Sequence, residues 1–128
     1  MFYNVENLFD TIDNAVTFDE DFTPNGKLEY NSIRYHEKLD HLAMVIDSSF
    51  NGEQPSVIGL CEVENRDVVA ALRDEAALIN LHDIVHIESP DGRGIDNALL
   101  FDPTLFELEE FGLKSIDLGA DQRPTRGI

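Results

Sequence analysis

An α/β fold built on a mixed sheet is predicted by three features of this sequence. Apolar runs typical of strands alternate with segments of helical periodicity up to about residue 78. Residues 56–61 form a continuous apolar run after a proline, as in a strand that is buried on both faces. From residue 83 onward, short apolar segments are separated by turn residues, which favours antiparallel strands. The order strand, helix, strand, helix and then further strands predicts a sheet with both parallel and antiparallel neighbours.

The N-terminal region supplies a strand, a loop and a helix. Residues 2–4 are expected to be the end of a strand, and the polar segment 10–31, with its DEDFTPNG stretch, is expected to be a loop. A helix is predicted from residue 32 to about residue 50, capped by Asn31 or Ser32. Its apolar positions recur at helical spacing: Tyr35, Leu39, Leu42, Ala43, Ile46 and Phe50.

The remainder of the chain supplies a second helix and a group of strands. The helix is predicted over residues 66–78, with Asn65 near its start. Strands are predicted over 83–88 and 95–101, joined by the turn sequence SPDGRG, and a further strand over 106–116, broken near its glycine. No internal repeat or low-complexity segment interrupts this order.

Composition limits the classes of function. The 128 residues are enough for one domain or a piece of one, and 42% hydrophobic residues can bury a core. The 26 acidic residues against 9 Lys and Arg give a net charge of -17. This charge argues against a chain that binds a polyanion through its own surface. It favours a small substrate, or metal ions that supply the positive charge, although solubility alone also explains it.

No targeting or membrane signal is visible in the sequence. No apolar run approaches the ~18 residues that a membrane-spanning helix needs, and no basic segment followed by an apolar one stands at the start. We expect a soluble protein of unknown compartment, from a cytoplasmic or a secreted parent. Cys61 is the single cysteine, and its place in the apolar run indicates a buried, inert thiol.

Two polar side chains follow predicted strands. Asn4 and Glu62 are expected at the carboxyl ends of their strands, where open α/β sheets gather their functional groups. An amide oxygen and a carboxylate are hard ligands that suit Mg²⁺, Mn²⁺ or Ca²⁺. Such an ion keeps open positions for water and a phosphate oxygen. A turn asparagine and a helix-capping glutamate are the structural alternative.

Three blocks of sequence carry a family resemblance: FYNVENLFD at residues 2–10, PSVIGLCEVENR at residues 55–66 and HIESPDGRGIDNALLFD at residues 86–102. In this order and spacing they resemble the endonuclease/exonuclease/phosphatase superfamily, which has the DNase I-like fold. The resemblance is closest to a bacterial branch whose members begin with the signature Y-N-V-E-N-L-F-D. It implies half of a four-layer α/β/β/α sandwich, with a mixed sheet flanked by two helices.

The resemblance also implies roles for individual residues. Asn4 and Glu62 match the family's metal-site and catalytic positions, which implies Mg²⁺ as the cofactor, with Mn²⁺ or Ca²⁺ possible. Asn65 and Arg66 follow Glu62 in the family pattern and are expected to border the substrate cleft. Arg93 is expected to contact a phosphate, because its guanidinium fork fits phosphate geometry, or else to stabilise a turn.

Two further residues of the third block are expected to be structural. Asp96 is expected to pair with a nearby backbone group or an arginine. His86 begins a loop near the expected cleft, but a lone histidine in a strand pattern is more often structural than catalytic.

The chain departs from the family pattern in one respect. The later G-D-x-N and S-D-H blocks, which supply an Asp and a His for catalysis, are not in the sequence. We therefore expect residues 1–128 to be the N-terminal part of a divalent-metal-dependent phosphoester hydrolase, inactive in isolation. The substrate of the parent is expected to be a nucleic acid or a small phosphate ester. The alternative is a non-catalytic interaction or scaffold fragment that keeps the fold.

An assembly of copies is the last expectation. Residues 84–87 and 98–101 are rich in apolar side chains on both strand faces, and the family covers the outer face with its second sheet. If that face is uncovered in this chain, burial of its apolar surface favours a homodimer or a larger assembly.

Overall fold

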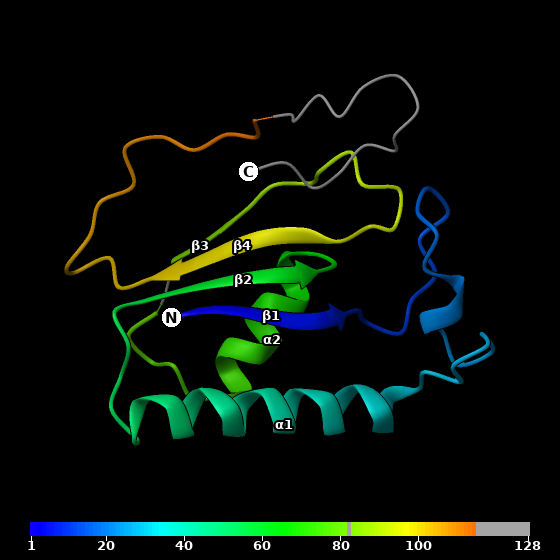
Figure 1. Ribbon diagram of the computed structural model, residues 1–128, viewed down its shortest axis with the longest axis horizontal. Helices are drawn as coiled ribbons and strands as arrows, with labels where there is room; N and C mark the ends of the chain where they lie inside the picture. Colours follow the sequence, from blue (N-terminus) through cyan, green and yellow to red (C-terminus); the bar gives the residue numbers. More distant parts are fainter. Residues whose placement is uncertain (82, 115–128) are drawn as a thin grey trace.

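The structure is a computed structural model that describes residues 1–81 and 83–114. Its four strands form one open sheet in the order β1-β2-β4-β3. β1 and β2 are parallel, whereas β4 is antiparallel to both β2 and β3 (Figure 1). The strands are β1 (Phe2–Leu8), β2 (Val57–Val63), β3 (Asp83–His86) and β4 (Asp96–Phe101). The predicted mixed sheet is therefore confirmed, and it is consistent with half of a DNase I-like sandwich.

Two helices pack against one face of this sheet. In α1 (Ser32–Phe50) the side chain of Asn31 accepts bonds from two amides of the first turn, so Asn31 is the N-cap. Asn51 ends this helix in the left-handed conformation, at φ 52°. α2 (Arg66–Glu75) is shorter than predicted, because Ala77 turns left-handed at φ 49° just after it.

The main core lies between the helices and the sheet. Alternate residues of the strands point toward the helices and meet their apolar stripes there. The most buried members are Val5, Leu8, Leu39, Ile46, Ile58, Leu60, Val63, Val68, Val69, Leu72, Leu81 and Leu100. At ~1.5–3 kcal/mol for each large side chain, this layer is the chief source of the fold's stability.

The other face of the sheet is partly covered by the segment that follows β4. A depression of about 550 Å³ lies there, bordered by Phe2, Val85, Leu99, Phe111 and Leu113 among others. The Phe2 ring lies over β2 at Gly59, where an added Cβ would come within 2.8 Å of the ring and displace it. This face is apolar but open, since Phe2 is 85% exposed.

The predicted strand over residues 106–116 is wrong for the described residues 106–114, which are irregular. Their apolar side chains alternate, but Phe111 and Leu113 border the depression on the sheet face. These contacts are made by side chains with a sheet face, and alternation alone does not provide the backbone ladder that a strand needs. The last two residues of that prediction lie outside the described residues.

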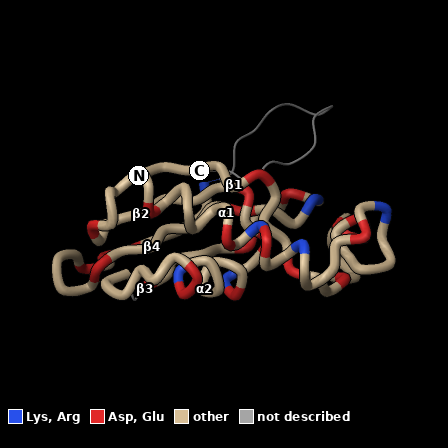
Figure 2. Tube along the Cα trace, turned by 90° about the horizontal axis from the view of Figure 1, so that it is seen from below, with Lys and Arg blue, Asp and Glu red and all other residues tan. Residues whose placement is uncertain are grey.

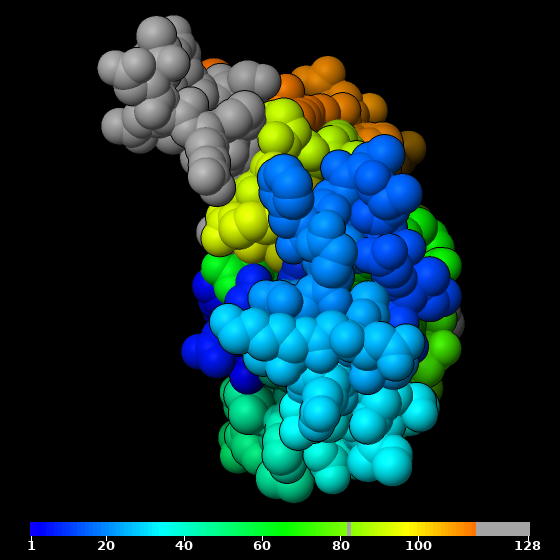
Figure 3. Space-filling model, turned by 90° about the vertical axis from the view of Figure 1, so that its right-hand side faces the viewer, coloured from blue at the N-terminus to red at the C-terminus, as the bar shows by residue number. Residues whose placement is uncertain are grey.

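The predicted loop 10–31 lies at the carboxyl end of β1 and covers that end of the molecule (Figure 3). It contains a short 3-10 turn, η1 (Glu20–Phe22). Phe9 and Phe22 stack with their ring centroids 4.1 Å apart, and Tyr30 meets Phe22 edge-on at 5.7 Å. These aromatic contacts, with Ile95, form a second small core that fixes the loop to the sheet.

Acidic residues outnumber basic ones along the described part of the trace (Figure 2). In the described part of the chain, no helix has the length and apolar character needed to cross a membrane.

Candidate active site at the carboxyl edge of the sheet

β1 changes conformation directly after Asn4. Its regular pairing with β2 ends at the pair Asn4 and Cys61, and Glu6 and Asn7 then adopt left-handed conformations, with φ 54° and 62°. The side-chain oxygen of Asn4 accepts a bond from the Glu6 amide at 2.8 Å, which closes this turn. Asn4 thus stands within β1 as observed, but at the end of its regular part, close to where it was predicted.

Glu62 occupies a second break in the same edge. The pairing of β2 with β4 shifts between Cys61 and Val63, and Glu62 between them has φ 67°. A bulge of this kind redirects a side chain, and left-handed backbone at a residue other than glycine costs about 1–2 kcal/mol. Such strain is commonly found at functional sites. The residue that the sequence selects as a metal ligand therefore lies at a strained backbone position, half-buried at the sheet edge.

Lys38 extends from α1 to this edge. Its Nζ donates to the backbone carbonyl of Glu6 at 2.6 Å. Burial lowers the pKa of Lys38, and the carboxylates of Glu6 and Glu62 oppose that shift. Both carboxylates are therefore within electrostatic reach of one ammonium group.

Behind these residues, Glu64 joins the ends of β1 and β2. Its amide donates to the carbonyl of Leu8 at 3.0 Å, and its carboxylate accepts from the Asp10 amide at 2.7 Å. Burial raises the pKa of Glu64 to about 7, and the carboxylates of Asp10, Asp19 and Glu88 add to the rise, whereas the Asp10 amide opposes it.

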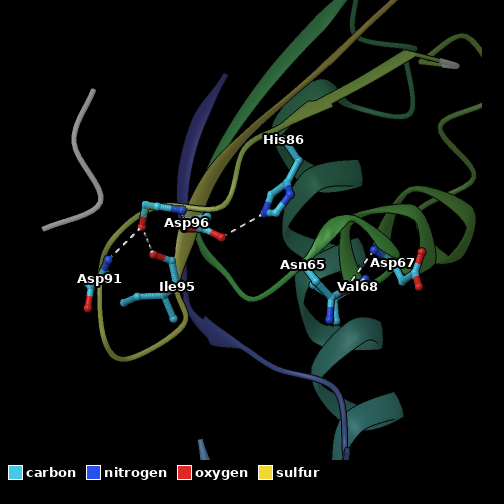
Figure 4. A network of polar contacts seen from close by, with 8 residues as sticks. Asn65, Asp67, Val68, His86, Asp91, Ile95 and Asp96 are labelled. Carbon is cyan, nitrogen blue, oxygen red and sulfur yellow. Dashed lines mark hydrogen bonds and ion pairs between the residues drawn. The ribbon is translucent and has the colours of Figure 1, made fainter. Parts of the chain in front are cut away.

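Asn65 is the N-cap of α2. Its Oδ1 accepts from the amides of Asp67 and Val68 at 2.9 and 3.0 Å (Figure 4), and its Nδ2 donates to Asp10 at 3.2 Å. The cap uses the oxygen of the side chain. Arg66, the first residue of α2, is exposed. Asn65 and Arg66, which were predicted to border the substrate cleft, thus lie shortly after the Glu62 break. Asn65 has a structural role there as the helix cap.

Arg93 is bound to its own turn. Its Nε and NH2 donate to the two oxygens of Asp91 at 3.0 and 2.7 Å, and its amide also donates to Asp91. The hydrogen bonds that Arg93 donates to the Asp91 carboxylate raise the pKa of Arg93, burial opposes this rise, and the charge of Glu62 adds to it. The geometry matches the turn-stabilising alternative, while the 59% exposed side chain lies within electrostatic reach of Glu62.

Gly94 completes this turn with φ 67°, and Thr17 lies against it so closely that an added Cβ would come within 2.8 Å. The Phe18 amide donates to the carbonyl of Gly92 at 2.9 Å. The loop after β1 is therefore docked on the turn that holds Arg93.

His86 and Asp96 form a buried pair where β3 ends and β4 begins. His86 Nε2 lies 3.1 Å from Asp96 Oδ2, and the Ser89 amide donates to Asp96 Oδ1 at 2.8 Å (Figure 4). Their side chains are 6% and 2% exposed. Asp96 pairs with a backbone group as predicted, but its second partner is His86, since Arg93 is held by Asp91.

The chain was then compared with known proteins. The model of the Endonuclease/Exonuclease/phosphatase family matches residues 1–127. The chain belongs to this family. Comparisons with curated proteins and with solved structures gave no match. Members of the endonuclease/exonuclease/phosphatase family are hydrolases of phosphoesters that generally use divalent metals, so the hydrolase class and the α/β fold predicted from sequence are confirmed at this level.

Sequence reasoning missed two residues of this candidate site. Lys38 lies in a helix 24 residues before Glu62 and has no motif that marks it. Glu64 stands two residues after Glu62 in LCEVEN. Residues two positions apart in a strand point to the same face, and this alternation was the one sequence signal that could have grouped Glu64 with Glu62. The backbone breaks at Glu6 and Glu62 carry no sequence signal, because neither position is a glycine.

Proposed function

We propose that this chain carries the metal-ligand part of a divalent-metal-dependent phosphoester hydrolase, with Glu62 as the principal ligand and Asn4 beside it. The observation that carries the proposal is the strained break at Glu62, at the same sheet edge where the regular part of β1 ends at Asn4. Both residues offer oxygen, and hard oxygen donors at an acidic edge fit Mg²⁺, with Mn²⁺ and Ca²⁺ as close substitutes.

The bound ion would polarise the phosphoester and neutralise the charge that develops in hydrolysis. The chain's own residues position and balance this site. Lys38 fixes the left-handed turn of β1 through the Glu6 carbonyl and partly balances the carboxylates of Glu6 and Glu62. Arg93, within electrostatic reach of Glu62, is the cation that would contact a substrate phosphate, in exchange for Asp91.

The substrate is a phosphoester, either a nucleic acid or a small phosphate ester, and residues 1–128 correspond to the N-terminal part of the family domain. We expect little turnover by the chain alone, because each missing acid or base role typically costs ~10²-fold or more. The apolar depression beneath Phe111 favours association of two copies through the open sheet face. Sedimentation at moderate salt tests this: a monomer that binds no hydrophobic dye would exclude such a dimer.

Metal binding by Glu62 is the direct test. Titration of Mn²⁺ into the protein, followed by water-proton relaxation, is expected to show binding on the order of millimolar, because few protein ligands hold the ion. Glu62→Gln is expected to weaken it at least about 10-fold, since a neutral amide replaces the charged ligand. Glu53→Gln makes the same change at an exposed loop position and is the control. Equal binding by both variants would remove Glu62 from the site.

A further inference from the structure

A second group of potential metal ligands lies on the β3–β4 hairpin. His86, Glu88 and Asp96 each place one ligand atom within 4.8 Å of the other two, and no other such set of His, Cys, Asp and Glu occurs among residues 1–81 and 83–114. The closest two atoms, His86 Nε2 and Asp96 Oδ2, are 3.1 Å apart. Neighbouring ligands with bonds of about 2.0–2.1 Å to one ion are separated by roughly 3–3.4 Å. The His86–Asp96 spacing therefore suits a shared ion, and a Glu88 oxygen lies within 4.8 Å of both ligand atoms.

The two inner ligands are oriented by the hairpin itself. The Ser89 amide holds Asp96 Oδ1, which leaves Oδ2 directed at His86 (Figure 4). The Ser89 hydroxyl donates to the carbonyl of Ile95 at 3.3 Å and accepts from the Asp91 amide at 3.3 Å, so the loop that carries Glu88 is fixed at both ends. Hydrogen bonds behind the ligands are the usual support of a protein metal site.

Among the described residues, no Lys or Arg balances the carboxylates of this cluster. A protonated His86 offsets one carboxylate, but Glu88 and Asp96 bring two within a few ångströms. In the described ranges no Lys or Arg forms an ion pair with either carboxylate, since Arg93 is bound to Asp91 and Arg73 to Asp74. Glu88 also adds to the rise in the pKa of Glu64, so its charge acts on an edge that is already acidic. A divalent cation would offset these repulsions.

We propose that His86, Glu88 and Asp96 bind a divalent ion of the Zn²⁺ class at the β3–β4 hairpin. One imidazole and two carboxylates are a donor set that suits Zn²⁺, with Co²⁺ as its spectroscopic substitute, better than Mg²⁺. Water completes the coordination on the exposed side, where Glu88 lies. The ion would fasten the end of β3 to the start of β4. This site does not depend on the hydrolase proposal, because it shares no ligand with Asn4 and Glu62.

The test uses the metal-free 128-residue protein, titrated with Zn²⁺ by calorimetry and with Co²⁺ by visible absorption. We expect one Zn²⁺ to bind per chain, and we expect substitutions of the hairpin ligands to weaken this binding. Glu88→Gln, at an exposed position that leaves the buried pair intact, is expected to weaken Zn²⁺ at least about 10-fold. Glu110→Gln, with the same charge change at an exposed position, is expected to have no effect.

Two further variants distinguish this site from its neighbours. His86→Gln should remove the Co²⁺ absorption, whereas His41→Gln, at an exposed position on α1, should preserve it. Glu62→Gln should leave Zn²⁺ binding unchanged, which separates the hairpin site from the Mg²⁺ site. Zn²⁺ binding that is equal in Glu88→Gln and Glu110→Gln, or no binding at millimolar Zn²⁺, would overturn the proposal and leave His86 and Asp96 as a structural pair.

Discussion

The β1–β2 end and the β3–β4 hairpin lie at the same edge of the sheet, yet they hold their polar residues in different ways. At the β1–β2 end, Glu6, Asn7 and Glu62 have left-handed backbone and at least partly exposed side chains, and Lys38 binds the Glu6 carbonyl. In the hairpin, Asp96 and His86 are buried and their bonds to each other and to Ser89 fix them. The first region thus holds its polar groups at a cost in backbone strain. The second holds its polar groups through buried contacts that stabilise the fold.

The largest expected difference between the two regions concerns Asp96. Asp96→Ala should lower the free energy of unfolding by about 3 kcal/mol or more, because it leaves His86 and the Ser89 amide buried without their acceptor. Asn4→Ala, which removes one exposed bond to the Glu6 amide, should cost less than about 1 kcal/mol. Urea unfolding of both variants measures the contrast, and equal losses would show that the hairpin is not the more stabilising region.

The next effect is a pH dependence at the β1–β2 end. Burial raises the pKa of Glu64 to about 7 from 4.5, so the folded state keeps a proton that the unfolded state releases. The contribution of Glu64 to the free energy of unfolding is fully present below pH ~4.5. It falls as the pH rises toward 7 and is lost above pH ~7, a total loss of up to about 3 kcal/mol.

Glu64→Gln should remove this part of the pH dependence, since an amide stays neutral and still accepts from the Asp10 amide. Unfolding by urea at a series of pH values, for both proteins, gives the difference. A difference between the two proteins that does not change from pH 4 to pH 8 would mean that Glu64 titrates normally.

Backbone strain at Glu62 should give a smaller effect, in which one substitution is more stable than another. The free energy of unfolding of Glu62→Gly should exceed that of Glu62→Ala by about 1 kcal/mol, because glycine adopts φ 67° without a Cβ clash. Both variants lack the carboxylate, so the comparison isolates the backbone. If the alanine variant were equally stable, the left-handed conformation at this position would carry no strain.

The smallest effect is expected at Arg93. Its pair with Asp91 is close but 59% exposed on the arginine side, so Arg93→Gln should change stability by at most about 1 kcal/mol. Thermal unfolding at low and high salt checks this, with Arg73→Gln, another exposed arginine paired with an aspartate, as the comparison. A larger loss of stability for the Arg93 variant alone would show that Arg93 mainly stabilises its turn and is not available to a substrate phosphate.

Periodicity and caps determined most of the secondary structure. Asn31, one of the two predicted caps, caps α1, and Asn65, predicted near the start of the second helix, caps α2; the strands near residues 57, 84 and 96 follow from apolar runs and the SPDGRG turn. Motif matches then determined the family. These features are local, because a cap or an alternating strand is specified by residues a few positions apart.

Tertiary structure alone decided where the polar groups meet. Residues 106–114 alternate like a strand but are irregular, and Phe111 and Leu113 border the depression on a sheet face. Lys38 reaches Glu6 across 32 residues, and His86 meets Asp96 only because β3 and β4 pair in one register. The left-handed conformations at Glu6 and Glu62 lie where the pairing of their strands shifts register, and neither residue is a glycine. Such contacts depend on register, packing and burial over long separations, whereas the sequence pattern records only which face each residue prefers.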